Sequence, residues 1–220
     1  MCIDNFFQNP DEIVRYAKQC EYYPSETGAW PGKRTKHFHL ISPELHRHFG
    51  RKVLATLFPN NYENITYNMG KVCFQKISPE YINKGWIHVD GPADLTVIVY
   101  LSKHKKCGTS IFQYKGAFPT PTEELMQVKK KTYKEKSFGQ ETETLKKNNN
   151  DFEEAISFNS SYNRAIFFDG YQWHGAKQFV EKNIKEDRLT LIGFYYGINS
   201  TKFHVTENNR LWKQNYILKN

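Results

Sequence analysis

A histidine and an aspartate stand two residues apart, at His88 and Asp90, shortly before the apolar run Leu95–Leu101. In an extended chain, side chains two residues apart point to the same side, so both could reach one ion. Imidazole and carboxylate supply two of the three ligands of the facial triad that binds iron(II) in proteins. With 8 histidines and 23 acidic residues in 220 positions, about one such pair is expected by chance, so the pair alone is a weak signal.

A second histidine, His174, has a setting that suits a third ligand. It follows the apolar segment Ala165–Phe168 and a glycine turn, and it lies 84 residues beyond Asp90, so it comes from a separate strand. Two imidazoles and one carboxylate leave positions open on an octahedral metal for a bidentate ligand and dioxygen. The sequence therefore predicts a metal site formed by His88, Asp90 and His174.

An arginine opens another apolar run 14 residues beyond His174, where Arg188 precedes Leu189–Tyr196. Burying a guanidinium is costly unless it meets an anion, and its planar fork matches a carboxylate. Thr190 lies two residues on, shares the face of Arg188 in a strand, and can add a hydroxyl to the same carboxylate. We predict that Arg188 and Thr190 bind a carboxylate beside the metal.

Helices are predicted in the first 60 residues, and strands after them. Asn9-Pro10 and Ser42-Pro43 each place a polar residue and a proline before an apolar stripe, which predicts helices to about Cys20 and to Leu57. β-branched and aromatic residues predict strands, which are expected over 65–77, 95–101, 165–168 and 189–196. This order predicts helices packed on an antiparallel β-sandwich or barrel, a mainly β (α+β) fold.

The chain has the length of one sizeable domain, and it contains no internal repeat. We therefore expect a single domain over 1–220. Its parts are an N-terminal helical region (1–60), a β core (61–112 and 161–200) and an insertion (113–160).

The insertion differs in kind from the rest of the chain. It contains the lysine runs Lys129–Lys131 and Lys146–Lys147 and then three asparagines, and an amphipathic helix is expected over about 122–134. Charge runs of this sort are usually solvated, and that is the favoured interpretation. A lid that covers the substrate is the alternative.

Composition narrows the class of protein. The net charge is +8 with a pI of about 9.1, which suits nucleic acid or an acidic partner, or simply a solvated surface.

The four cysteines have no metal-binding or disulfide spacing, so reduced thiols are expected. The start has no signal-peptide pattern, and no stretch is apolar enough to span a membrane. We expect a cytoplasmic protein without a membrane partner; its oligomeric state is not predicted.

Taken in order, the motifs resemble a known family. The matching motifs are His88-Val89-Asp90, Tyr100-Leu101-Ser102, Gly108-Thr109-Ser110-Ile111-Phe112, His174 and Arg188-Leu189-Thr190. This order is similar to that of the 2-oxoglutarate- and iron(II)-dependent dioxygenases, and closest to their prolyl-hydroxylase-like branch. The match covers roughly 65–115 and 160–197.

The resemblance implies a double-stranded β-helix, which is a jelly-roll or cupin-like barrel, with the N-terminal helices packed on it. It also implies iron(II), 2-oxoglutarate as cosubstrate and O2. In such a protein Arg188 would bind the far carboxylate of 2-oxoglutarate, and Tyr100 would contact the cosubstrate. Gln75 and Tyr67 are weaker candidates for the same contact, because no motif sets their register.

Some positions depart from the family pattern. Cys107 replaces the first glycine of a common Gly-Gly pair, and Ser102 replaces an asparagine. Neither departure removes a metal ligand. Nucleic-acid demethylases of the family carry a second arginine soon after the cosubstrate arginine, whereas here none follows Arg188 until Arg210.

The expected reaction is hydroxylation of an unactivated C–H bond in an amino acid or peptidyl residue, with release of succinate and CO2. The expected partner is thus a small molecule, peptide or protein. The alternatives are an oxidative demethylase of nucleic acid, which is disfavoured, and a cupin-like metal-binding module without turnover.

Two further features have less chemical specificity. His37 and His39, and likewise His46 and His48, are two apart, but no acidic residue accompanies the first pair, and the second lies in a predicted helix, where such residues point apart. The loop 30–34 could shape a pocket entrance, although a structural turn is favoured.

Overall fold

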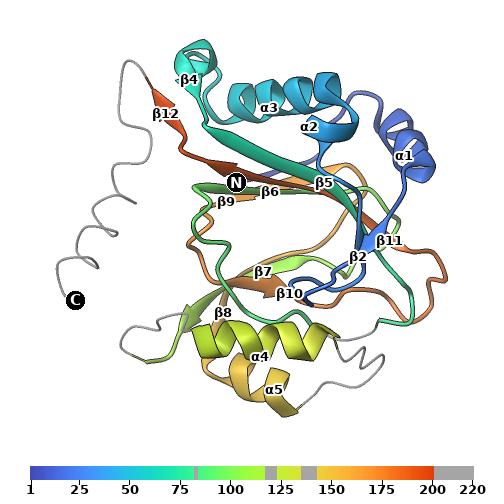
Figure 1. Ribbon diagram of the computed structural model, residues 1–220, viewed down its shortest axis with the longest axis vertical. Coiled ribbons are helices and arrows are strands. Elements are labelled where there is room, and N and C mark those ends of the chain that lie inside the picture. The colour runs from blue at the N-terminus through green and yellow to red at the C-terminus, as the bar shows by residue number, and fades with distance from the viewer. Residues whose placement is uncertain (82–83, 117–122, 135–142, 201–220) are drawn as a thin grey trace.

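Seven strands form the largest of three antiparallel sheets in the computed structural model, which describes residues 1–81, 84–116, 123–134 and 143–200 (Figure 1). The long strand β11 (Arg188–Tyr196) pairs with β5 (Met69–Ile77) on one side and β6 (Leu95–Tyr100) on the other. The remaining strands of this sheet are β1 (Cys2–Ile3), β9 (Arg164–Phe168), β3 (Lys33–Arg34) and β2 (Tyr23–Pro24).

The smaller sheet lies below the large one in Figure 1. Its three strands, in spatial order, are β10 (His174–Ala176), β7 (Thr109–Tyr114) and β8 (Phe152–Phe158). A further two-stranded pair joins β12 (Asn199–Ser200) to β4 (Ile65–Thr66).

The mainly β architecture with helices is confirmed, but the described strands do not close into a barrel. No ladder of hydrogen bonds joins the large sheet to the small one within the described ranges. The segment between β5 and β6 meets the small sheet through an isolated bridge between His88 and His174 and through a backbone hydrogen bond of 2.7 Å from Gly85 to Ala176. This opening leaves room for side chains between the sheets.

Three helices pack on the outer face of the large sheet (Figure 1). They are α1 (Pro10–Gln19), α2 (Phe38–Ile41) and α3 (Pro43–Leu57), and a short 3-10 helix, η1 (Tyr62–Asn64), follows them. The two predicted helices are present, whereas α2 was not predicted. Asn9 makes no side-chain hydrogen bond to α1, so the favourable first-turn groups are Pro10 and the two acids after it.

Alternation along β11 separates the core from the space between the sheets. Leu189, Leu191 and Tyr195 lie in one hydrophobic cluster with Phe49 and Val53 of α3. The intervening side chains line a cavity on the opposite face, and they are Arg188, Thr190, Ile192 and Phe194. The period of two in a strand therefore gives this single segment a core face and a cavity face.

The insertion between β7 and β8 contains two helices, α4 (Glu123–Lys134) and α5 (Glu143–Asn150) (Figure 1). Tyr133 and Leu145 are buried in a second hydrophobic cluster that includes Ile77 and Trp86. These two helices therefore pack on the domain and are not a solvated arm. Thr122, at the predicted helix start, lies outside the described residues, as do 135–142 and 201–220.

Replacing Leu191 with alanine is expected to lower the free energy of unfolding by about 3 kcal/mol, because a buried side chain is removed and a cavity remains. Denaturant unfolding followed by circular dichroism measures the change. Leu40→Ala is the matched control, since Leu40 is 65% exposed, and it should change stability by less than about 0.5 kcal/mol. An equally small effect of Leu191→Ala would contradict the assigned core.

Candidate metal centre and its cavity

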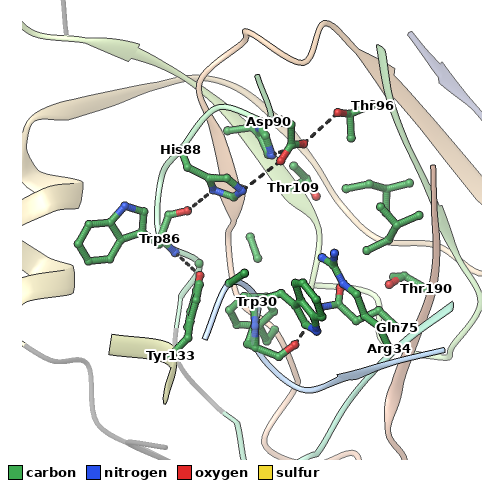
Figure 2. Close-up of a pocket in the computed structure, with 18 of the residues that line it drawn as sticks. Trp30, Arg34, Gln75, Trp86, His88, Asp90, Thr96, Thr109, Tyr133 and Thr190 are labelled. Atoms are coloured by element: carbon green, nitrogen blue, oxygen red, sulfur yellow. Dashed lines mark hydrogen bonds and ion pairs between the residues drawn. The ribbon is translucent and has the colours of Figure 1, made fainter. Parts of the chain in front are cut away.

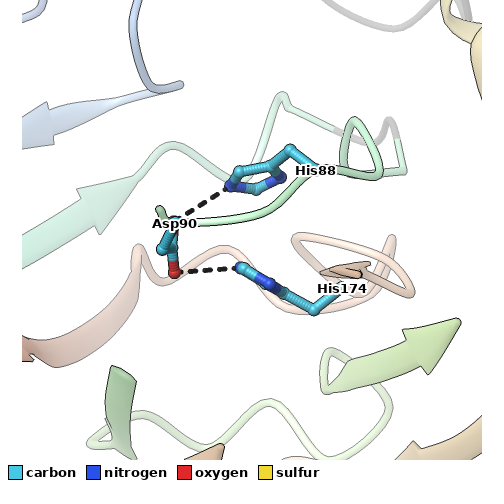
Figure 3. A group of neighbouring side chains, drawn as sticks. All are labelled: His88, Asp90 and His174. Carbon is cyan, nitrogen blue, oxygen red and sulfur yellow. Dashed lines mark ion pairs between the residues drawn. The ribbon is translucent and has the colours of Figure 1, made fainter. Parts of the chain in front are cut away.

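Three polar side chains from two distant segments converge in Figure 3. His88 and Asp90 lie between β5 and β6, and His174 begins β10. Two backbone hydrogen bonds of 2.9 Å join His88 to His174. The Nε2 atom of His88 lies 3.4 Å from Oδ1 of Asp90, and the Nε2 atom of His174 lies 3.1 Å from Oδ2. The three predicted ligands are thus together, with their ligand atoms within 4.8 Å of one another.

Backbone carbonyls set the orientation of both imidazoles. The Nδ1 atom of His88 lies 2.7 Å from the carbonyl oxygen of Trp86, and that of His174 lies 2.9 Å from the carbonyl oxygen of Gln172. A carbonyl only accepts, so each Nδ1 carries the proton and donates. With Nδ1 as the donor, Nε2 of each ring faces Asp90 and is the atom placed to bind a metal, which is the arrangement found in metal-bound histidines.

The charges of these groups suit a metal cation. Burial lowers the pKa of His88 to about 4, and the charges of Lys129 and His174 act in the same direction, so its ring is neutral near pH 7. Burial alone would raise the pKa of Asp90, but the adjacent His174 and His88 hold it well below its usual value, so the carboxylate is ionised. Nitrogen lone pairs that face a carboxylate fit a divalent metal of the iron(II) type.

Hydrogen bonds from the surrounding chain hold the ligands in place. Thr96 donates from Oγ1 to Oδ2 of Asp90 at 2.9 Å (Figure 2). Asn149 of α5 accepts from the backbone nitrogen of Ile87 at 3.1 Å and donates to the carbonyl oxygen of Gly85 at 2.9 Å. Asn148 donates to the carbonyl oxygen of Ile87 at 3.2 Å. The asparagine run of the insertion therefore orients the segment that presents His88.

A cavity of about 150 Å³ extends from these ligands to Arg188 (Figure 2). Its wall comes from both sheets, from the loop before β3 and from α4. Its polar and aromatic lining residues are Trp30, Arg34, Gln75, Trp86, His88, Asp90, Thr96, Thr109, Lys129, Tyr133, His174, Phe179, Arg188, Thr190 and Phe194.

Arg188 is buried in this cavity without an acidic partner among the described residues. It is 4% exposed, its Nε donates to the carbonyl oxygen of Cys107 at 3.3 Å, and its guanidinium lies 5.6 Å from the centre of the Tyr100 ring. The hydroxyl of Thr190, on the same face, is buried and has no hydrogen-bond partner. A buried cation and an unused hydroxyl side by side leave a place for an anion.

The other predicted cosubstrate contacts differ in their surroundings. Gln75 pairs in register with Thr190 and lines the cavity, where its amide donates to the carbonyl oxygen of Pro31 at 2.8 Å. Tyr100 also pairs with Thr190, but its hydroxyl donates to Oγ1 of Thr109 at 2.9 Å. Tyr67 packs against Tyr195 on the helix-covered face, so the structure does not bring it to the cavity.

Four residues of the cavity come from segments for which the sequence favoured another role, with a pocket entrance and a lid as the alternatives. Trp30 and Arg34 come from the loop that was interpreted as a structural turn, and Lys129 and Tyr133 come from the insertion that was interpreted as solvated. The only sequence signal for Lys129 and Tyr133 was the amphipathic pattern of the predicted helix. That pattern indicates a buried face but not what the face covers.

A second group with metal-ligand chemistry consists of His104, Cys107 and Glu181. Both imidazole nitrogens of His104 are already used, because Nδ1 accepts from the backbone nitrogen of Glu181 at 3.2 Å and Nε2 donates to the carbonyl oxygen of Glu186 at 3.0 Å. The Glu181 carboxylate accepts from the backbone nitrogens of Lys105 and Lys106. This group links two loops and offers no free histidine nitrogen to a metal.

Comparison with solved structures shows the fold. The chain is similar to the crystal structure of HygX from Streptomyces hygroscopicus with nickel and 2-oxoglutarate bound. The TM-score is 0.53 and the identity 12%, and the match covers 89% of this chain and 82% of that one. The epimerase SnoN with Fe3+, α-ketoglutarate and nogalamycin RO is similar too (TM-score 0.55, 12% identity, 91% and 80%). The predicted resemblance is therefore confirmed for the fold; these identities carry no activity over to this chain.

Sequence comparisons add a family but no activity. Residues 1–195 match the model of a family described as "Family of unknown function (DUF6445)". A search of curated proteins finds no match. In the described parts of the chain, no helix is long and apolar enough to cross a membrane.

Replacing Thr96 with valine is expected to weaken Ni(II) binding about tenfold, because Asp90 loses the hydrogen bond that orients it. Competition with a fluorescent chelator measures the affinity. Thr109→Val is the matched control. Thr109 lines the same cavity and is buried, but its hydroxyl is bonded to Tyr100 and not to one of the predicted metal ligands. Equal affinities of the two variants would contradict the role given to Thr96.

Proposed function

We infer that this chain, which belongs to the DUF6445 family of unknown function, is an iron(II)- and 2-oxoglutarate-dependent oxygenase. One observation carries the proposal. A His–Asp–His group and a buried arginine without an acidic partner among the described residues line the same cavity. The first fits a divalent metal and the second fits a carboxylate.

His88, Asp90 and His174 would hold the metal from one side and leave its other positions facing the cavity. Arg188 and Thr190 would bind the far carboxylate of 2-oxoglutarate, and Gln75 lies beside them in register. Tyr100 would support Arg188 through its ring, whose centre lies 5.6 Å from the guanidinium carbon. The two open sheets would then correspond to the halves of a jelly roll around the cosubstrate.

Bound iron(II), 2-oxoglutarate and O2 supply oxidation of an unactivated C–H bond: one oxygen atom enters the substrate, the other enters succinate, and CO2 leaves. The residues of this chain bind and orient the reactants. Arg188 fixes the cosubstrate at its far end, and the carbonyls of Trp86 and Gln172 keep both histidines in the metal-binding tautomer. Trp30 and Tyr133 help to exclude water from the cavity.

We place the protein in the prolyl-hydroxylase-like branch of these oxygenases. The proposed substrate is therefore an amino acid or a peptidyl residue. The insertion would act as a lid, since α4 contributes Lys129 and Tyr133 to the cavity wall. Demethylation of nucleic acid is disfavoured, because the lysine that the insertion contributes to the cavity is buried and not part of an open basic surface. A metal-binding module without turnover would leave the anion site around Arg188 without a role.

Anaerobic titration of the apo protein with Fe(II) and 2-oxoglutarate is expected to produce the weak visible charge-transfer band of the chelate. His174→Ala should remove the band with the metal, and Arg188→Gln should raise the 2-oxoglutarate concentration needed by tenfold or more, because the carboxylate loses its charged partner. His48→Ala and Arg51→Gln, both at exposed positions of α3, are the matched controls.

Iron binding without the band in the wild-type protein would refute the cosubstrate assignment. Conversion of 2-oxoglutarate to succinate under air then separates an oxygenase from a binding module. If the wild type forms the chelate but never produces succinate, the module is the correct description.

A further inference from the structure

Two cations lie in the cavity on the metal side, apart from Arg188. Lys129 projects from α4 and is only 7% exposed, and Arg34 ends β3. Both line the cavity that contains His88 and Asp90, and both also line a wider groove of about 600 Å³ that adjoins it. They therefore stand where a molecule would pass from the groove to the metal.

Neither cation has an acidic partner in the described part of the chain. Arg34 stacks on Trp30, with its guanidinium carbon 4.5 Å from the ring centre, and its buried Nε has no hydrogen-bond acceptor (Figure 2). The indole nitrogen of Trp30 is also buried without a partner. Polar groups that are buried and unused in this way indicate a ligand with acceptor atoms.

Lys129 and Arg34 both interact electrostatically with Asp90, one of the predicted metal ligands. Burial lowers the pKa of Lys129 to about 8, Asp90 opposes this effect, and the charge of Arg34 adds to it. Asp90 also acts on Arg34, whereas the groups that act on Arg188 are Tyr100 and Cys107. Arg34 and Lys129 thus form one positive centre near the metal, and Arg188 forms another at the far end.

The side chains that line the cavity carry more positive than negative charge. Among the described residues that line the cavity, the charged ones are three cations (Arg34, Lys129 and Arg188) and one carboxylate (Asp90). A divalent metal and a doubly negative cosubstrate cancel each other, so they leave this excess unchanged. The excess positive charge lies beside the metal, where a substrate would react.

We propose that Arg34 and Lys129 bind an anionic group of the substrate, a carboxylate or a phosphate ester on a small molecule, next to the metal. The term substrate rests on the proposed function; the anion site itself does not. Arg34 presents a planar fork to two oxygens, and Lys129 adds a point charge from the opposite element. Trp30 keeps the fork in place by stacking.

This site favours a free acid over a residue inside a peptide. A main-chain peptide unit is neutral and would leave both cations without a partner. The carboxylate of a small acid, or a phosphate ester, brings negative charge on a compact group. A polyanion such as nucleic acid presents many phosphates to an open basic surface, whereas here the centre is a single pair, the buried Lys129 and the half-buried Arg34, in the wall of a cavity.

The test uses the full chain loaded with Mn(II) and saturated with 2-oxoglutarate, with acetate and methyl phosphate as probes. Binding beside the metal is expected to increase the relaxation rate of the probe methyl protons in NMR, relative to neutral acetamide and to Zn(II)-loaded protein. Arg34→Gln and Lys129→Met should each reduce this enhancement about tenfold. The two probes separate a carboxylate site from a phosphate site.

Lys130→Met is the matched control, because Lys130 neighbours Lys129 on α4 and lines neither the cavity nor the groove. It should leave the enhancement unchanged. Lys129→Met should also melt at the same or a higher temperature than the wild type, since a buried charge without a partner is removed. A clearly lower melting temperature would assign Lys129 a structural role and overturn the proposal.

Three other results would overturn the proposal. The relaxation rates of acetate and methyl phosphate could increase no more than that of acetamide, or their increase could survive both substitutions. Arg34→Gln and Lys129→Met could also lose as much affinity for 2-oxoglutarate as Arg188→Gln does. Failure of the proposed function is recognised separately, because the wild type would then bind no 2-oxoglutarate. In that case saturation-transfer NMR of acetate with metal-free protein still tests whether Arg34 and Lys129 bind an anion.

Discussion

Positive charge buried without a partner is the constraint on which the rest of this structure depends. Arg188 and Lys129 are buried, Arg34 is half-buried, and all three line one cavity, where Asp90 is the only carboxylate among the described lining residues. Burial of such charges costs several kcal/mol each, so the fold is less stable than it would be with apolar side chains in these places. The arrangement is understandable if the missing negative charge comes with ligands, and the mutual repulsion of these cations then favours binding of anions.

The register of the large sheet connects this cavity to the hydrophobic core. Arg34, Gln75 and Thr190 lie opposite one another on β3, β5 and β11, so their side chains share the cavity face. A slip of one residue along β11 would turn Leu189 and Leu191 into the cavity and place Arg188 and Thr190 in the core. Packing of the N-terminal helices on the outer face therefore also decides which groups face the metal centre.

The insertion completes the site from the opposite side. Its helix α4 contributes Lys129 and Tyr133 to the wall, and Asn148 and Asn149 of α5 hold the backbone that leads to His88. Ligand geometry and cavity lining thus depend on the same pair of helices. A change in the packing of this insertion would therefore alter the candidate metal centre and the proposed anion site together.

The sequence by itself determined the elements with a local signature: the two N-terminal helices, the long strands, and the spacing of His88, Asp90, His174 and Arg188. The spacing was enough to predict these residues, because a strand directs alternate side chains to one face. Two residues that are two apart in a strand are therefore expected to act at the same place. Only the tertiary structure decided that Lys129 is buried and that Arg34 joins it, because a lysine run has the same composition whether it is solvated or packed. Whether a charge has a partner depends on contacts between segments far apart in the chain, and no local pattern records those contacts.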